Sequence, residues 1–408
     1  MEVVRIIGTL EPGGAQLSAL RLSRALRRHG IHTRCLLAGE GTTTGLNLAR
    51  RFGMPAYVFS EPDGLQWRPS TAFAAWLADR LVDADLVHAH MFGAWWAAAQ
   101  VVPDGVPLVA SEHNVMSWPH GDYSAAAAQA VGRVDSFFAH GPAARGFAAS
   151  IGVPPGRLLE GRSAVDGLDA SPLPGLAPRR ITFTGRFRED KAPDVLVDAL
   201  ALLPDAPTAY LAGDGPMRRR LQARITSLGL ANRVVLPGWV YEPARYVVGS
   251  SVHVVPSREE ACSQSAIVAL GLGVPVVGTD VEGLTTTLGE RRGVLVPPED
   301  PPAMAAAVQR VLAGEHPPAE PGFAYAARYT PDLVAEQYAR VYLDLAAAHN
   351  PGAGDPRIRS GLRPGIDEAK RPWIRHGTGR SGETAIDFIA GDDRPMILAV
   401  AESRKQRH

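Results

Sequence analysis

The chain has 408 residues, 46% of them hydrophobic, which suffices for two domains of ordinary size with buried cores and excludes a disordered chain. Its 42 basic and 42 acidic residues cancel, so the charge gives no reason to expect binding to nucleic acid or to an anionic membrane. The two cysteines, Cys35 and Cys262, lie far apart, predict no disulfide framework and favour a cytoplasmic location.

The first part of the chain, residues 1–165, alternates predicted strands with predicted helices. Its start, Met1–Gly8, is too short and too charged for a signal peptide, and no apolar run reaches the roughly 20 residues that a membrane helix needs. Leucines at helical spacing follow the first strand and stop at Gly30, a typical helix end. Short apolar runs predict strands at residues 3–7, 33–38, 85–88, 107–111 and 136–139. This alternation predicts an α/β domain with a parallel, doubly wound sheet.

The Pro- and Gly-rich stretch 166–178 is predicted to link this domain to a second α/β domain, residues 179–322. Strands of the second domain are predicted at residues 181–184, 208–212, 234–236, 252–255, 275–278 and 293–296. An amphipathic helix, Thr330–Ala347, is expected within residues 323–348, with an apolar side formed by Leu333, Val334, Tyr338, Val341, Tyr342 and Leu345. Residues 349–408 are expected to be a flexible tail, in which Ile386–Ile389 and Met396–Val400 could form short strands.

Two cations follow the strand at 181–184, and a helix start follows the strand at 252–255. Arg186 and Lys191 follow the first of these strands and Gly185, at the edge of a predicted helix. Backbone amides at a helix N-terminus attract anions, and cations add charge-assisted hydrogen bonds. The combination therefore predicts a site for a diphosphate; the alternative is a solvated surface pair.

Glycines and histidines follow strands of the first domain, at the edge where open parallel sheets bind ligands. Gly13 and Gly14 do not have the spacing of the dinucleotide fingerprint, so no nicotinamide cofactor is expected, and they could form a simple turn. His113 is a candidate ligand contact, or else a half-buried, hydrogen-bonded histidine. His88 and His90 share one face of a strand and could bind zinc, but no third ligand is near, so no metal site is predicted.

Taken in order, these motifs resemble those of the retaining glycosyltransferases of family 4 (glycosyltransferase group 1), over roughly residues 1–347. The loop glycines, the strand-end histidine, Gly-Arg-x-x-x-x-Lys, Gly-Asp-Gly-Pro and Gly-x-Pro-Val-Val occur in the order found in that family. The resemblance implies the GT-B fold, in which two doubly wound, Rossmann-like domains face a cleft. It also implies that the second domain holds the donor, the first holds the acceptor, and a C-terminal helix crosses back onto the first domain.

The resemblance further implies roles for individual residues. His113 and Glu260 would be catalytic, facing the transferred sugar. The donor phosphates would be bound by Arg186, Lys191, Gly14, Ser263, Gln264 and Ser265. The nucleotide base or the sugar would contact Gly213, Trp239 and Glu282, and the acceptor side would include Gly13 and His90. Gly213 could instead serve a tight turn, Trp239 could be part of the core, and Glu282 could simply turn the chain.

One position departs from the family pattern. Aligning on Gly273–Val277 places the first glutamate of the family signature at Glu260 and the second, which holds the ribose hydroxyls in the family, at Val268. Valine cannot accept those hydrogen bonds, and losing a bidentate carboxylate contact costs roughly 2–3 kcal/mol if nothing replaces it. Either another group binds the ribose, or nucleotide affinity is lower, or this member is altered in function.

The predicted function is transfer of a sugar from a nucleoside diphosphate sugar to a hydroxyl acceptor, with retention of configuration and without a cofactor or metal. UDP is the expected nucleotide, by its frequency in the family, and glycan, glycolipid or antibiotic biosynthesis is the expected pathway. Two alternatives remain open: a nucleotide-sugar 2-epimerase on the same fold, and a non-catalytic glycosyltransferase-like partner, which Val268 motivates. Weak peripheral membrane contact could come from Arg21, Arg24, Arg27 and Arg28, which could equally form a solvated helix face.

Overall fold

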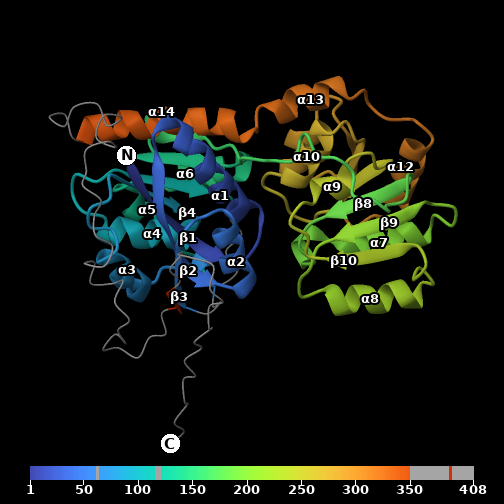
Figure 1. Ribbon diagram of the computed structural model, residues 1–408, viewed down its shortest axis with the longest axis horizontal. Coiled ribbons are helices and arrows are strands. Elements are labelled where there is room, and N and C mark those ends of the chain that lie inside the picture. The colour runs from blue at the N-terminus through green and yellow to red at the C-terminus, as the bar shows by residue number, and fades with distance from the viewer. Residues whose placement is uncertain (61–63, 115–120, 350–385, 388–408) are drawn as a thin grey trace, which may run out of the picture.

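The computed structural model describes residues 1–60, 64–114, 121–349 and 386–387. They form two α/β domains that lie side by side, each built on its own sheet (Figure 1). Every strand pair is parallel except the pairing of the short strand β14 with β3. The doubly wound parallel sheets predicted from the sequence are therefore confirmed.

The first sheet has the strand order β14-β3-β2-β1-β4-β5-β6-β7. Its strands are β1 (Glu2–Leu10), β2 (His32–Gly41), β3 (Ala56–Ser60), β4 (Leu86–His90), β5 (Leu108–Glu112), β6 (Ser136–Ala139), β7 (Leu158–Glu160) and β14 (Ile386–Asp387). Helices α3 (Thr71–Ala78), α4 (Phe92–Val101) and α5 (Ser124–Val131) pack on one face. Helices α1 (Gly14–Leu26) and α2 (Thr43–Arg51) cover the other, and α6 (Pro142–Ser150) follows β6. Because both faces are covered, β4, β5 and β6 are buried along their whole length.

The second sheet has the order β10-β9-β8-β11-β12-β13. Its strands are β8 (Arg180–Thr184), β9 (Thr208–Ala212), β10 (Val234–Gly238), β11 (Val252–Val255), β12 (Val276–Thr279) and β13 (Val294–Val296). One face is covered by α7 (Pro193–Ala201), α8 (Arg218–Ser227) and α12 (Pro301–Leu312). The other face is covered by α9 (Ala244–Val247), α10 (Gln264–Gly271), α11 (Glu282–Leu288) and α13 (Glu320–Ala327).

The last described helix, α14 (Pro331–His349), returns from the second domain to the first and packs against α1 (Figure 1). Its position agrees with the helix predicted at residues 330–347, but one residue of the predicted apolar side is wrong. Leu333 is 51% exposed, because the buried face follows Val334, Tyr338 and Tyr342 at four-residue steps.

Strands β3 and β7 were not predicted from the sequence. Of the predicted tail, only His349 and residues 386–387 are described; the remaining residues, and the predicted strand Met396–Val400, lie outside the described part. Residues 386–387 fall within the predicted strand Ile386–Ile389 and form β14. The domain limits expected from the sequence stay a prediction. No helix in the described part of the chain combines the length and the apolar character needed to cross a membrane.

Candidate active site

Strands β8 and β11 are neighbours at the centre of the second sheet, although they lie far apart in the sequence. From β8 the next strands in the sequence are added on one side, and from β11 they are added on the other side. The loops that follow β8 and β11 therefore diverge and leave a crevice at the carboxyl ends of these two strands. Arg186 and Lys191 lie in the loop behind β8, and Glu260 lies in the loop behind β11. The topology thus brings together the two segments that the sequence suggested for phosphate binding.

A cleft of ≈ 820 Å³ is lined by residues of both domains. The first domain contributes the loop and helix start at residues 13–17, together with His113. The second domain contributes Arg186, Lys191 and residues 259–265. All of the site residues predicted from the sequence line this cleft except His90 and Glu282.

Lys191 and Glu260 form an ion pair inside the cleft. The Nζ atom of Lys191 lies 3.0 Å from Oε1 and 2.9 Å from Oε2 of Glu260. The hydroxyl of Ser257 donates a further hydrogen bond to Oε2, over 3.1 Å. The Glu260 side chain is only 10% exposed, so these contacts hold its carboxylate in one orientation at the wall of the cleft.

Arg186 has a second arginine and a carboxylate beside it. Glu11 of the first domain places Oε2 3.6 Å from Nη1 of Arg186 and 3.6 Å from Nη1 of Arg188. Burial, and then the neighbouring Arg188, lower the pKa of Arg186, which nevertheless stays a cation. The sequence reasoning missed Glu11 and Arg188; the presence of Arg188 within the Arg186–Lys191 loop was the available signal.

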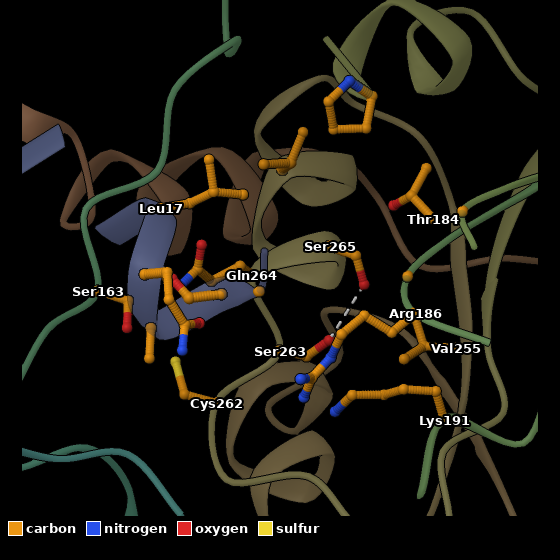
Figure 2. A pocket seen from close by; sticks show the side chains of 18 of the residues that line it. Leu17, Ser163, Thr184, Arg186, Lys191, Val255, Cys262, Ser263, Gln264 and Ser265 are labelled. Carbon is orange, nitrogen blue, oxygen red and sulfur yellow. Dashed lines mark hydrogen bonds between the residues drawn. The ribbon is translucent and has the colours of Figure 1, made fainter. Parts of the chain in front are cut away.

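The start of α10 faces the same part of the cleft. Figure 2 shows Ser263 and Ser265, joined by a 3.3 Å hydrogen bond, on the side toward which Arg186 and Lys191 point. Ser263 caps the helix, since its hydroxyl accepts a hydrogen bond from the amide of Ala266. Cations and helix amides therefore converge on one region, as an anion site requires.

Gln264 joins α10 to the first domain. Its Nε2 donates to the backbone oxygen of Gly14 over 2.7 Å, and its Oε1 accepts from Nη1 of Arg21 over 3.2 Å. A Cβ atom at Gly14 would lie 3.1 Å from Nε2 of Gln264, and one at Gly13 would lie 3.6 Å from Cζ of Arg186. The two glycines thus allow Arg186 and Gln264 of the second domain to approach the first helix closely.

His113 lines the cleft, whereas His90 does not. His90 is 2% exposed and lies behind His113, with its Nδ1 3.1 Å from Nε2 of the latter. His90, expected on the acceptor side, is thus buried behind the cleft wall and reaches the cleft only through His113. Burial, and to a smaller extent the nearby Arg5 guanidinium, lower the pKa of His113 to about 3, so His113 is neutral near pH 7.

Glu112 supports the loop that carries His113, and the sequence reasoning missed it. Its Oε1 accepts hydrogen bonds from the amides of His113 (3.0 Å) and Asn114 (3.2 Å) and from Nδ2 of Asn114 (2.9 Å). Its Oε2 accepts from Nε1 of Trp95 over 3.2 Å. Burial raises its pKa to about 7 although these hydrogen bonds oppose the shift. An acidic residue at the end of a buried strand was the available signal.

Of the three residues predicted to contact the nucleotide base or the sugar, two line the cleft and one does not. Gly213 lines the cleft, and a Cβ atom there would lie 1.8 Å from the backbone oxygen of Gly185, so only glycine fits. Trp239 also lines the cleft, and its buried Nε1 has no hydrogen-bond partner among the described residues. Glu282 is exposed at the start of α11 and does not line the cleft. Val268 lines it from α10, half-buried.

The four arginines of α1 and the turn after it do not form one membrane-facing patch. Arg21 is 6% exposed and forms a 2.6 Å ion pair with Asp166 beside the cleft. Arg24 lies over the ring of Phe52, 5.0 Å from its centroid, and Arg28 pairs with Asp332 of α14 over 2.5 Å. Arg21 is therefore unavailable to a membrane, whereas Arg24, Arg27 and Arg28 are exposed, and the weak membrane contact expected from the sequence stays a prediction.

Metal ligation can be considered only for the described residues. Among them, no group of three or more His, Cys, Asp or Glu side chains is placed to hold a metal ion. His88 and His90 instead contact each other's rings and Arg5. The metal-free reaction expected from the sequence stays a prediction.

Comparison with protein families gives two matches. Residues 12–159 match the model described as Glycosyltransferase Family 4, and residues 178–314 match that described as Glycosyl transferases group 1. Each match covers one of the two α/β domains, and together they span more than two thirds of the chain.

Three of the curated relatives that the chain matches carry glycosyltransferase names. The chain is 28% identical over 296 residues to TuaC of Bacillus subtilis, named for teichuronic acid biosynthesis; the alignment covers 64% of this chain and 72% of TuaC. It is 38% identical over 156 residues to a D-inositol 3-phosphate glycosyltransferase of Jonesia denitrificans, covering 35% of this chain and 37% of that protein. It is 31% identical over 153 residues to the alpha-D-kanosaminyltransferase of Streptomyces kanamyceticus, covering 36% of this chain and 38% of that protein. The last two matches thus span less than half of those relatives.

Solved structures share the fold. HepE of Anabaena, determined with UDP, aligns with a TM-score of 0.68 at 20% identity, over 84% of this chain and 99% of HepE. Sucrose-phosphate synthase from Thermosynechococcus elongatus aligns with a TM-score of 0.67 at 19% identity, over 85% of this chain and 100% of the synthase. At these identities the likeness concerns the fold alone. The two matched domains, the curated relatives and the shared architecture establish that the chain belongs to the group 1 glycosyltransferases of family 4, with the GT-B fold.

Proposed function

We propose that this glycosyltransferase takes its sugar from a nucleoside diphosphate sugar, most readily a UDP-sugar, and transfers it to a hydroxyl acceptor with retention of configuration. The observation that carries the proposal is the convergence of Arg186, Lys191 and the N-terminus of α10 at the β8–β11 crevice. These groups suit a diphosphate in charge and in hydrogen-bond donors. HepE, which shares the fold, has been determined with UDP and with UDP-glucose, and this favours UDP here.

In the proposed reaction the phosphate site acts mainly on the leaving group. As the bond between the sugar and the diphosphate breaks, negative charge grows on the departing oxygen, and Arg186 and Lys191 lie where they would stabilise it. The departing phosphate would accept the proton of the acceptor hydroxyl on the same face of the sugar, which retains the configuration. Glu260, held by Lys191 and Ser257, would contact the transferred sugar, and His113 would contact it from the first domain.

The names of the relatives suggest the setting of the reaction. TuaC is named for teichuronic acid biosynthesis, and the kanosaminyltransferase for transfer of kanosamine. We therefore propose glycan, glycolipid or antibiotic biosynthesis for this chain. A reaction without a metal ion is part of the proposal, since Arg186, Lys191 and the helix amides supply the positive charge.

Val268 motivates a second candidate function, a non-catalytic partner protein. A valine in the cleft cannot accept hydrogen bonds from ribose hydroxyls, so nucleotide affinity would be weakened. Against this candidate, Arg186, Lys191 and Glu260 are all present, and the last two are paired in the cleft. A nucleotide-sugar 2-epimerase on the same fold is not favoured by any contact in the cleft.

Calorimetric titration with UDP, GDP and ADP tests the proposal. We expect micromolar binding of one nucleotide, and a loss of about tenfold to 150-fold in affinity for Arg186→Ala, because one charge-assisted hydrogen bond contributes roughly 1.5–3 kcal/mol. Arg219→Ala, at an exposed position on α8, is the matched control and should bind as the wild type does. Binding of none of the three nucleotides would reject the donor site and favour the non-catalytic partner.

A further inference from the structure

A row of buried polar side chains lies on the face of the first sheet that α14 covers. Arg5 on β1 and His88 on β4 are register partners, and His90 lies two residues further along β4. Arg5 and His88 are 0% exposed and His90 is 2% exposed. The proposed function uses none of these three side chains; it uses His113, which contacts His90 and lines the cleft.

Arg5 is a buried cation whose donors are directed at histidines. Its Nη1 lies 2.8 Å from Nδ1 of His88 and 2.8 Å from Nε2 of His90, and its Nε donates to Oγ of Ser23 over 2.9 Å. Among the described residues, no carboxylate lies within ion-pair distance of Arg5. A guanidinium can only donate, so both imidazole nitrogens that it contacts must be unprotonated acceptors.

The position of the proton on the His90 ring determines the position of the proton on the His113 ring. Because Nε2 of His90 accepts from Arg5, the proton of the neutral ring is on Nδ1. That Nδ1 lies 3.1 Å from Nε2 of His113, so it donates and the His113 nitrogen accepts. The single proton of neutral His113 must then be on its Nδ1, which has no hydrogen-bond partner among the described residues.

We infer that Arg5 and His90 are positioning residues that hold His113 in the Nδ1–H tautomer, so that His113 offers the substrate a hydrogen-bond donor and not a basic lone pair. The identity of the substrate oxygen that accepts this bond rests on the proposed function; the tautomer does not. His113 acts through this N–H on an oxygen in the cleft, and Arg5 and His90 act only through His113.

Neighbouring contacts hold the ring of His113 in place. It packs on the ring of His140, with centroids 3.8 Å apart. The His140 ring is itself held at both nitrogens, 3.1 Å from the hydroxyl of Tyr338 on α14 and 3.3 Å from that of Ser163. Burial and the charge of Arg5 lower the pKa of His113, which agrees with a neutral ring; a second proton on Nε2 would face the N–H of His90.

Nitrogen NMR of the free full-length protein, labelled with ¹⁵N-histidine, tests the inference. Long-range ¹H–¹⁵N spectra distinguish a protonated from an unprotonated ring nitrogen, and the His113→Asn spectrum identifies the signals of His113. We expect a protonated Nδ1 and an unprotonated Nε2 in His113 at pH 7.5. A proton on Nε2 would overturn the inference, and this readout requires neither substrate nor activity.

Two substitutions of similar size separate a positioning role from a packing role. In His90→Asn the side-chain amide occupies the place of Nδ1 and can still donate to His113, whereas in His90→Gln it occupies the place of Nε2 and cannot. We expect His90→Asn to keep the Nδ1–H tautomer and His90→Gln to lose it. Sugar transfer should fall roughly two- to tenfold in His90→Gln alone, the value of one neutral hydrogen bond.

The outcomes separate this inference from the proposed function. An unchanged His113 tautomer in His90→Gln would overturn the inference, whether or not the enzyme transfers sugar. If His90→Gln does not fold, the wild-type spectrum and His90→Asn still decide it. A wild-type protein that shows the expected tautomer but binds no nucleotide would reject the proposed function and leave the positioning by Arg5 and His90 standing.

Discussion

At the scale of single residues, Glu11 lies beside two arginines of the proposed diphosphate site. Its carboxylate lies 3.6 Å from both Arg186 and Arg188, and its side chain is 36% exposed. Lys191, the third cation of the loop, is paired with Glu260 instead. A diphosphate bound at the proposed site would therefore compete with Glu11 for the two arginines.

Glu11→Gln should bind anions more tightly than the wild type. The substitution keeps the size of the side chain but removes the charge that competes for Arg186 and Arg188. Because a partly exposed ion pair contributes only about 0.2–1 kcal/mol, we expect the dissociation constant for UDP or pyrophosphate to fall roughly 1.5- to 5-fold at low salt. Calorimetry measures it, and Glu315→Gln at an exposed turn is the control. Weaker binding would mean that Glu11 supports the site.

Residues of the candidate site were predictable where a local motif marks them. Arg186 and Lys191 follow a strand and a glycine, and Ser263 opens a helix behind another strand, so the sequence alone places them at a sheet edge. Glu11 and Arg5 have no such motif. Their positions depend on which strands and domains become neighbours, and that depends on long-range packing which no short pattern specifies.

At the scale of elements, the turn behind β9 illustrates why a glycine is needed there. A Cβ atom at Gly213 would lie 1.8 Å from the backbone oxygen of Gly185, closer than any two non-bonded atoms can be. The amide of Gly185 donates to the backbone oxygen of Ala212, so β8 and β9 are joined at this point. Any side chain at residue 213 would push the end of β9 away from the loop behind β8, which carries Arg186 and Lys191.

Gly213→Ala should lower the free energy of unfolding by roughly 1–3 kcal/mol or more, because the backbone of β8 has to move. Gly146→Ala is the matched control. It lies within α6, where a Cβ atom would meet nothing within 4 Å, so the change should stabilise the helix by about 0.5–1 kcal/mol. Urea unfolding of both variants measures the difference. Equal effects would show that the close contact does not constrain the native turn.

Some strands were predicted from the sequence with correct limits, whereas others were missed. Strands such as β6 and β9 are mostly apolar runs between turn residues, and their limits agree with those expected from the sequence. β7 was missed because only three residues pair, behind a turn that contains two prolines. β14 pairs with β3 across most of the chain length, and such a partner cannot be read from local periodicity.

At the scale of the whole molecule, a set of neutral, buried histidines makes stability depend on pH. Burial is the largest cause of a lowered pKa in His88, His90, His113, His140 and His253. As the pH falls below about 6.5, the unfolded chain binds protons on these rings while the native protein does not. The free energy of unfolding must therefore decrease with falling pH. Glu112, whose pKa is raised to about 7, acts in the opposite direction but is a single group.

His253→Asn isolates one member of this set. His253 is 0% exposed in the second sheet, its Nδ1 lies 3.1 Å from Oγ1 of Thr182, and burial lowers its pKa to about 3. Asparagine can keep the contact to Thr182 but does not titrate. The wild-type free energy of unfolding should fall between pH 6.5 and 5, and the variant should lose up to about 1.4 kcal/mol per pH unit of that slope. Urea unfolding across this range measures both, with the exposed His316→Asn as control. A variant slope equal to that of the wild type would mean that His253 is protonated in the native protein or that another group takes up its proton.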